Sequence, residues 1–244
     1  RYPGAAADEL EHISFKVRKG QTLAVIGATG SGKTTLASLI PRFYDATAGT
    51  VLVDGVDVRA YTFDALYNKL GYVTQKAVLF SGTVEDNVFF GQSAAEKTDA
   101  SLQAALSLSQ AAEFVDKYPE KAAHPIAQLG RNVSGGQKQR LSIARALARK
   151  PEILIFDDSF SALDYKTDAV LREGLAKQLP GTTKIIVAQR ISTIRNADQI
   201  LVLDRGEIAG LGTHDELMVS CPVYREIAMS QLSEEELKKG GVSK

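Results

Sequence analysis

The stretch that decides the fold is TLAVIGATGSGKT, at residues 22–34. Residues 22–27 are mostly apolar, which predicts a buried β-strand, and the sequence after the glycines predicts a helix from about Lys33 to Tyr44. Residues 27–34 fit the pattern G-x-x-x-x-G-K-[ST] between these two elements. Glycines let the backbone curl so that successive N–H groups face one anion, and the helix adds its positive end. The stretch therefore predicts a cradle for phosphate groups, the alternative being a glycine-rich turn without a ligand.

The side chains of this loop suit a nucleotide with a metal ion. Lys33 would reach the β- and γ-phosphates as a point charge, and the Thr34 hydroxyl would ligate Mg²⁺, which prefers hard oxygens. Thr35 would contact the α-phosphate. The expected phosphate-binding residues are Gly27, Thr29, Gly30, Ser31, Gly32, Lys33, Thr34 and Thr35.

Strands and helices alternate along the rest of the chain. Further strands are expected at 50–55, where a turn signal ends the strand, and at 70–75, 153–157, 184–188 and 199–204. Between residues 83 and 150 the chain is instead rich in Ala, Leu, Gln and Ser at helical spacing, with one helix over 134–150 capped by Ser134. The alternation predicts an α/β fold with a largely parallel sheet, into which a helical block is inserted.

The composition limits the partners and the compartment. The 244 residues carry 29 Lys and Arg against 29 Asp and Glu, so there is no electrostatic case for nucleic acid as a partner. The single cysteine, Cys221, excludes an intrachain disulfide and suits a reducing compartment. No apolar run approaches the roughly 18 residues of a membrane helix. The chain starts without methionine and ends in a charged stretch, 233–244, expected to form a short helix that frays, so we expect a piece of a longer protein.

Two adjacent carboxylates follow the strand at 153–157. The sequence ILIFDDSFSALD places Asp157 at the strand's carboxyl end and Asp158 directly after it. Open α/β sheets bind their ligands at this end of the strands, and a carboxylate there can hold the water shell of Mg²⁺. Asp157 is therefore expected to serve the metal ion, the alternative being that it caps the next turn.

A second candidate anion site lies at 132–137. The sequence NVSGGQ, followed by Lys138, Gln139 and Arg140, resembles the signature of ATP-binding cassette (ABC) ATPases. Serine and two glycines at a helix start can bind an anion, although a plain helix cap is the alternative. In that family two domains meet head to tail, and each signature covers the γ-phosphate held by the other domain. The resemblance implies this role for Ser134, Gly135, Gly136 and Gln137.

Three further positions resemble family residues. Tyr2 resembles the aromatic side chain that stacks on adenine, the alternative being a terminal surface aromatic. Gln75 resembles the glutamine that touches Mg²⁺ or its water and links the ATPase core to the helical subdomain; it could instead simply face solvent. Asp164 resembles the loop residue that contacts the partner domain, and it can also cap a helix.

The resemblance covers nearly the whole chain and implies its organisation. It implies a single nucleotide-binding domain with a P-loop NTPase (RecA-like) core over 1–82 and 151–230, a mostly parallel sheet and an antiparallel β region near the N-terminus. The inserted α-helical subdomain would occupy 83–150 and a tail 231–244.

Residues 80–88 and 197–218 resemble exporter-type cassettes. The implied partners are the transmembrane domain of an ABC exporter, expected on the same polypeptide, and a second nucleotide-binding domain. The implied activity is ATP hydrolysis with ATP and Mg²⁺ at the cytoplasmic face of the cell membrane. The alternatives are an importer ATPase subunit and a non-transport ABC ATPase.

Two catalytic positions depart from the family pattern. Asp158 stands where the family usually has a glutamate that orients the attacking water; one methylene fewer withdraws the carboxylate by about 1.5 Å. A misplacement of about 1 Å can cost on the order of 100-fold in rate. Gln189 stands where a histidine usually contacts the γ-phosphate, and glutamine cannot carry positive charge or move a proton near neutral pH. Together they resemble the degenerate half of a heterodimeric multidrug-type exporter, with a slow site on this chain and a competent site on a different chain.

Overall fold

The computed structural model describes residues 1–92 and 96–232. Its contacts divide the chain into two compact units, one of residues 1–67 with 183–244 and one of residues 68–182. The helix expected at 233–244 lies outside the described residues.

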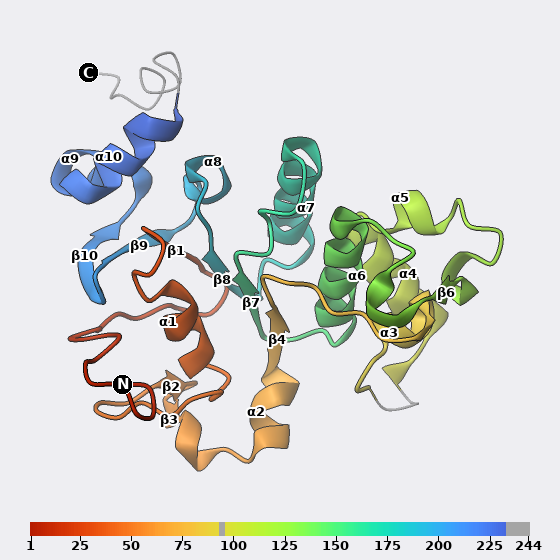
Figure 1. Cartoon of the computed structure of the whole chain (residues 1–244), viewed down its shortest axis with the longest axis horizontal. Coiled ribbons are helices and arrows are strands. Elements are labelled where there is room, and N and C mark those ends of the chain that lie inside the picture. The colour runs from red at the N-terminus through yellow and green to blue at the C-terminus, as the bar shows by residue number, and fades with distance from the viewer. Residues whose placement is uncertain (93–95, 233–244) are drawn as a thin grey trace. The chain divides into compact units, whose positions relative to one another are not determined.

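The first unit is built on a mostly parallel sheet. Its strands are β1 (Thr22–Gly27), β8 (Thr183–Val187), β9 (Gln199–Asp204) and β10 (Glu207–Gly212). β1 runs parallel to both β8 and β9, and β10 returns antiparallel along β9 (Figure 1). Residues 23–26 of β1 are almost fully buried, which confirms the expected buried strand. The mostly parallel α/β fold is thus confirmed.

The remaining elements of this unit are short. They are α1 (Lys33–Leu39), β2 (Leu52–Val53), β3 (Val56–Asp57), the 3₁₀ helix η1 (Val58–Ala60), α8 (Ile191–Ile194), α9 (His214–Ser220) and α10 (Pro222–Gln231), while α2 (Phe63–Lys69) runs past the unit's boundary. β2 and β3 pair antiparallel, which supplies the antiparallel region expected in this part of the chain.

Two of the expected boundaries in this unit are wrong. The helix expected to reach Tyr44 ends at Leu39, because Arg42 adopts a positive φ of 59° and the Phe43 N–H turns back to the Ser38 carbonyl. The strand expected over 50–55 is only two residues long. Asp54 and Gly55 both adopt positive φ and turn the chain into a hairpin, as in a type I′ turn.

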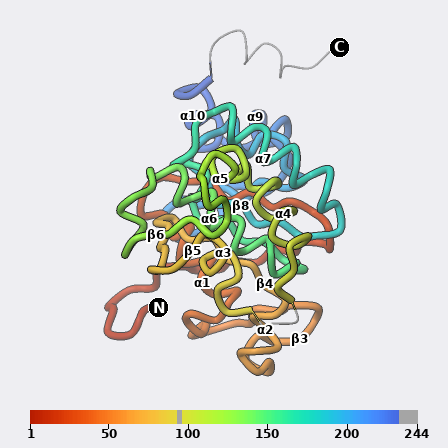
Figure 2. The backbone as a smooth tube through the Cα atoms, turned by 90° about the vertical axis from the view of Figure 1, so that its right-hand side faces the viewer, coloured from red at the N-terminus to blue at the C-terminus, as the bar shows by residue number. Residues whose placement is uncertain are grey.

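The second unit combines two parallel strands with a group of helices. β4 (Leu70–Val73) pairs in parallel with β7 (Ile153–Asp157). The helices are α3 (Val84–Val88), α4 (Asp99–Leu108), α5 (Ala112–Val115), α6 (Gly135–Ala148) and α7 (Tyr165–Gln178), and the shorter pieces are β5 (Gly82–Thr83), η3 (Lys121–Ala123), β6 (Pro125–Ile126) and η4 (Gln128–Gly130). α6 packs against α3, α4 and β4 (Figures 1 and 2).

Helix α6 confirms the helix expected over 134–150. Ser134 is its N-cap, and the helix ends at Ala148, two residues before Lys150 takes a positive φ of 49° ahead of Pro151. Leu141 and Ile143 are fully buried. Burial of these side chains and a good cap therefore fix both the position and the start of this helix. Among the described residues, we find no helix whose length and apolar character would let it span a lipid bilayer.

Candidate functional site

The glycine-rich loop of the first unit joins β1 to α1, and its glycines meet two different needs, close packing and a left-handed backbone. A side chain on Gly27 would place its Cβ 2.1 Å from the carbonyl oxygen of Leu203, so only glycine lets β1 lie this close to β9. Gly30 and Gly32 adopt φ of 80° and 95°, a left-handed conformation that side chains disfavour. The loop can therefore curl as the motif requires.

The loop offers donors that fit a phosphate group. The Ser31 hydroxyl is buried and, within the part of the chain that the structure describes, has no hydrogen-bond partner. The N-cap of α1 is Gly32, which has no side chain and so provides no side-chain hydrogen bond to the start of the helix. The Lys33 Nζ lies across the loop and donates to the carbonyl oxygens of Gly27 at 2.9 Å and Ala28 at 2.7 Å. A buried hydroxyl, an uncapped helix start and a lysine together fit the phosphates of a nucleotide.

The start of the chain lies beside the same helix. The hydroxyls of Tyr2 and Thr35 are hydrogen-bonded at 2.9 Å, and the Tyr2 ring packs edge-on against Tyr44 with ring centroids 4.8 Å apart. The structure thus brings Tyr2 and Thr35 together, although they lie far apart in the sequence, and Tyr2 is not a loose terminal aromatic. Thr29 and Thr34 are exposed.

Gln189 lies at the same edge of the sheet as the loop. β1 and β8 are parallel, and Val25 is in register with Val187, so the residues that follow these two strands emerge side by side. The side-chain amide of Gln231, in α10, holds the segment from Gln189 to Ile191. It donates to the Gln189 carbonyl at 2.8 Å and accepts from the Ile191 N–H at 2.9 Å. Gln231 was not among the residues predicted from the sequence.

The second unit carries the two acidic residues, and each has its own donor. Asp157 and Asp158 are 4% and 6% exposed. The Tyr72 hydroxyl donates to Asp157 Oδ2 at 3.0 Å, and the Gln75 side-chain amide donates to Asp158 Oδ2 at 2.9 Å. Gln75 is exposed but does more than face solvent, because its amide holds one of the two acids.

The backbone of Asp158 is held in an uncommon conformation. Its φ is 47°, in the left-handed region that aspartate tolerates better than most residues. Its carbonyl accepts a hydrogen bond from the Ser161 hydroxyl at 2.7 Å. The carboxylate of Asp158 is therefore fixed from both ends, at its backbone and at its side chain.

The oxygen donors fit Mg²⁺ in a nucleotide site. Such sites use one or two carboxylates together with phosphate oxygens, rather than a cage made only of protein ligands. In the second unit Asp157 supplies a carboxylate and Gln75 an amide oxygen, and in the first unit Thr34 carries an exposed hydroxyl. That the three residues serve one metal ion stays a prediction. Across residues 1–92 and 96–232, no cluster of three or more His, Cys, Asp and Glu could hold a metal ion alone.

The start of α6 is closed by a reciprocal capping box. The Ser134 hydroxyl accepts from the Gln137 N–H at 3.3 Å, and the Gln137 side chain accepts from the Ser134 N–H at 2.8 Å. This confirms Ser134 as a helix cap. A Cβ on Gly135 would meet nothing within 4 Å, and one on Gly136 would lie 3.5 Å from the Ala162 carbonyl. The backbone at this helix start is therefore open to approach.

Asp164 caps α7. Its carboxylate accepts from the Thr167 N–H at 2.9 Å and from the Thr167 hydroxyl at 2.7 Å. These hydrogen bonds, first the one from the Thr167 N–H and then the one from its hydroxyl, lower the pKa of Asp164 below its ordinary value. The alternative of a helix cap is confirmed, and contact with a partner domain stays a prediction.

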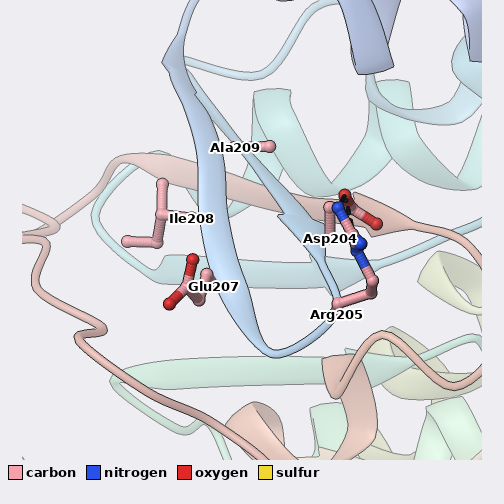
Figure 3. A pocket seen from close by; sticks show the side chains of 5 residues that line it. All are labelled: Asp204, Arg205, Glu207, Ile208 and Ala209. Atoms are coloured by element: carbon pink, nitrogen blue, oxygen red, sulfur yellow. Dashed lines mark hydrogen bonds and ion pairs between the residues drawn. The ribbon is translucent and has the colours of Figure 1, made fainter.

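A separate pocket of about 490 Å³ lies on the β9–β10 hairpin. Its lining is Asp204, Arg205, Glu207, Ile208 and Ala209 (Figure 3). Arg205 and Asp204 form an ion pair at 3.4 Å. The pocket contains none of the residues predicted to bind nucleotide, so it is not the candidate site.

Comparison with known proteins places the chain in a family. The profile of the family described as ABC transporter matches residues 10–161. This chain belongs to the ABC transporter family. It is an ABC nucleotide-binding domain, and the resemblance inferred from its motifs is confirmed at this level.

The relatives include exporter proteins. The chain is 48% identical over 231 residues to an uncharacterized ABC transporter ATP-binding protein of Mycobacterium tuberculosis, covering 94% of this chain and 39% of that protein. It is 41% identical over 235 residues to the ATP-dependent lipid A-core flippase of Aromatoleum aromaticum, covering 96% and 39%. A solved structure of a bacterial Atm1-family ABC exporter with ATP bound matches with a TM-score of 0.90 and 36% identity, covering 96% of this chain and 41% of that one. The chain thus spans less than half the length of each of these proteins.

Proposed function

We propose that this chain is the ATP-binding and ATP-hydrolysing cassette of an ABC exporter. It closes head to tail on a second nucleotide-binding domain and thereby drives movement of a transmembrane domain, expected on the same polypeptide. Its place is the cytoplasmic face of the cell membrane. Membership of the family, the flippase relative and the likeness to an exporter structure with ATP bound support this proposal.

The residues of the first unit bind the nucleotide. Tyr2 stacks on the adenine, and the backbone of 27–34 with Lys33 and Thr35 holds the phosphates. Thr34 with Asp157 and Gln75 holds the metal ion, which when bound neutralises charge on the phosphates. Asp158 orients the attacking water, and Gln189 donates a hydrogen bond to the γ-phosphate.

This chain's own site is slow, and the hydrogen bond from Gln75 to Asp158 carries that part of the proposal. The Asp158 carboxylate is about 1.5 Å shorter in reach than a glutamate. The Gln75 amide also holds it by a hydrogen bond of 2.9 Å. Ser161 also fixes its backbone, so the chain cannot shift easily to make up the missing length. Gln189 cannot compensate, because glutamine carries no positive charge and cannot take up or release a proton near neutral pH.

The partner's site is the competent one. The intact signature Ser134, Gly135, Gly136 and Gln137 covers the γ-phosphate bound by a different chain, and Asp164 lies in the contact between the two domains. The transporter is therefore a heterodimer with two unequal ATP sites.

The test is steady-state hydrolysis of Mg²⁺-ATP by the isolated chain at high concentration. The unmodified chain should bind ATP but turn it over slowly, and the double variant Asp158→Glu, Gln189→His should be faster by on the order of 100-fold. Adding Lys33→Ala to the double variant is the control, because it should return the rate to background. Equal rates for the unmodified chain and the double variant would contradict the slow site and favour an ordinary symmetric cassette.

A further inference from the structure

Tyr72 in β4 and Gln75 just after it each donate a hydrogen bond to one of the two acids, and only Gln75 was among the site residues predicted from the sequence. Gln75 bonds Asp158, whereas Tyr72 bonds Asp157. We propose that Tyr72 is a positioning residue for the metal ion, because its hydroxyl sets the orientation of the Asp157 carboxylate. This inference rests on the proposed role of Asp157 toward Mg²⁺.

The register of the sheet places the two side chains on one face. β4 and β7 are parallel, and Tyr72 is in register with Ile155. Side chains two residues apart on a strand point to the same face, so Asp157 lies on the face that Ile155 shares with Tyr72. The diagonal separation of such a pair, about 7–8 Å, is within reach of an aromatic side chain. The contact thus follows from strand pairing, 85 residues apart in the sequence.

The hydrogen bond has a directional consequence. A carboxylate has two acceptor oxygens in one plane. Because the hydroxyl sits on a rigid ring and bonds Oδ2 at 3.0 Å, it fixes the plane in which Oδ1 lies. Asp157 is 4% exposed, so bulk water is a poor substitute for this donor. Groups that orient metal ligands in this way typically change metal affinity or activity by about 10- to 100-fold when removed.

A substitution at Tyr72 can therefore affect the orientation of Asp157 without affecting Asp158. Tyr72→Phe keeps the ring and removes only the hydroxyl, so packing on the sheet is retained. Gln75 and its bond to Asp158 stay in place. A purely structural Tyr72 would change the stability of the domain, whereas a positioning Tyr72 changes how strongly Mg²⁺ supports nucleotide binding.

The experiment measures binding of a fluorescent ATP analogue to the full chain, once in EDTA and once in Mg²⁺. For Tyr72→Phe, we expect the dissociation constant in EDTA to match that of the unmodified chain, while the gain in affinity from Mg²⁺ falls about 10-fold. Tyr118→Phe is the matched control. Tyr118 lies in the same unit but packs against Phe114 and His124, so its gain from Mg²⁺ should be unchanged.

A second variant decides whether the effect runs through Asp157. In an Asp157→Asn background, Tyr72→Phe should cause no further loss of the Mg²⁺ gain, because there is no carboxylate left to orient. Two results would overturn the role of Tyr72 without touching that of Asp157. Either Tyr72→Phe keeps the full gain in affinity from Mg²⁺, or it loses the same factor of affinity in EDTA and in Mg²⁺. If the unmodified chain binds the analogue but gains nothing from Mg²⁺, the metal role of Asp157 fails, and the role of Tyr72 fails with it.

Discussion

Two helices of this chain begin at glycine-rich motifs, and their starts are built in opposite ways. α1 begins at Gly32, which is left-handed and offers no side-chain cap. α6 begins at Ser134, whose hydroxyl and backbone are both satisfied by Gln137 in a capping box. The first start depends on tertiary contacts for its shape, whereas the second is closed by residues within one turn.

The difference teaches where each motif can be altered. The loop before α1 is held by close backbone approach, as at Gly27 against Leu203, so its shape and its ligand binding fail together. The start of α6 is capped by its own residues, and a side chain at Gly135 would meet nothing within 4 Å, so changes there should spare this chain's fold. This fits a motif that serves a partner's nucleotide. Two predictions test the contrast between α1 and α6, and a third compares α6 with the capped helix α7.

The largest expected effect is on stability, when the first glycine of the phosphate loop or of the signature is replaced by alanine. Gly27→Ala should lower the free energy of unfolding by about 3 kcal/mol, because its Cβ must displace a backbone carbonyl in β9. Gly135→Ala should raise it by up to about 1 kcal/mol, since alanine is the better helix former and nothing lies within 4 Å. Urea unfolding of both variants measures this. Comparable losses in the two variants would show that the helix starts do not differ as described.

The second effect is on nucleotide affinity. Lys33→Ala should weaken binding of ATP to the isolated chain by roughly 10- to 100-fold, the range of one to two charge-assisted hydrogen bonds. Ser134→Ala should leave that affinity unchanged and cost about 1 kcal/mol of stability through the lost cap. Calorimetric titration with ATP separates the two outcomes. Weaker binding of ATP to the Ser134→Ala chain would mean that the signature serves this chain's own site.

The elements that local pattern determines were predictable from the sequence. β7 and β9 occupy the expected residues, and α6 starts at the expected cap, because apolar runs and cap residues act over a few neighbours. The end of α1 and the length of β2 depend instead on a backbone turn at Arg42 and on a hairpin through Asp54. No residue pattern in those stretches indicated a left-handed conformation for arginine.

The candidate site shows the same division. The phosphate loop was predicted from its motif, the acids from their place after a strand and the signature from its resemblance to a family. That family is confirmed, and the roles of these residues stay predictions. Tyr72 and Gln231 were missed, because each acts through a contact with a residue far away in the sequence. Tyr72 bonds a residue 85 positions away, and Gln231 bonds one 42 positions away. The only signal for Tyr72 was a tyrosine in a strand before Gln75, and it required the pairing of β4 with β7 to become informative.

The smallest expected effect concerns pH, and it contrasts the cap of α7 with that of α6. The Thr167 N–H and hydroxyl hold the pKa of Asp164 below its ordinary value of 3.8. The group therefore contributes stability that is fully present above pH 3.8 and is lost as the pH falls through the lower pKa of the folded chain. The cap of α6 contains no carboxylate, so it should not respond in that range.

NMR titration of the Thr167 and Gln137 amides checks this last prediction. The Thr167 amide should shift with a midpoint below 3.8, and the Gln137 amide should report no local titration. Asp164→Asn should abolish the Thr167 transition while keeping the cap, because asparagine caps helices about as well as aspartate. A Thr167 midpoint at or above 3.8 would mean that the carboxylate is not held by the cap in solution. The exposed loop would then be free to turn Asp164 toward a partner domain, and the contrast between the two capped helices would be lost.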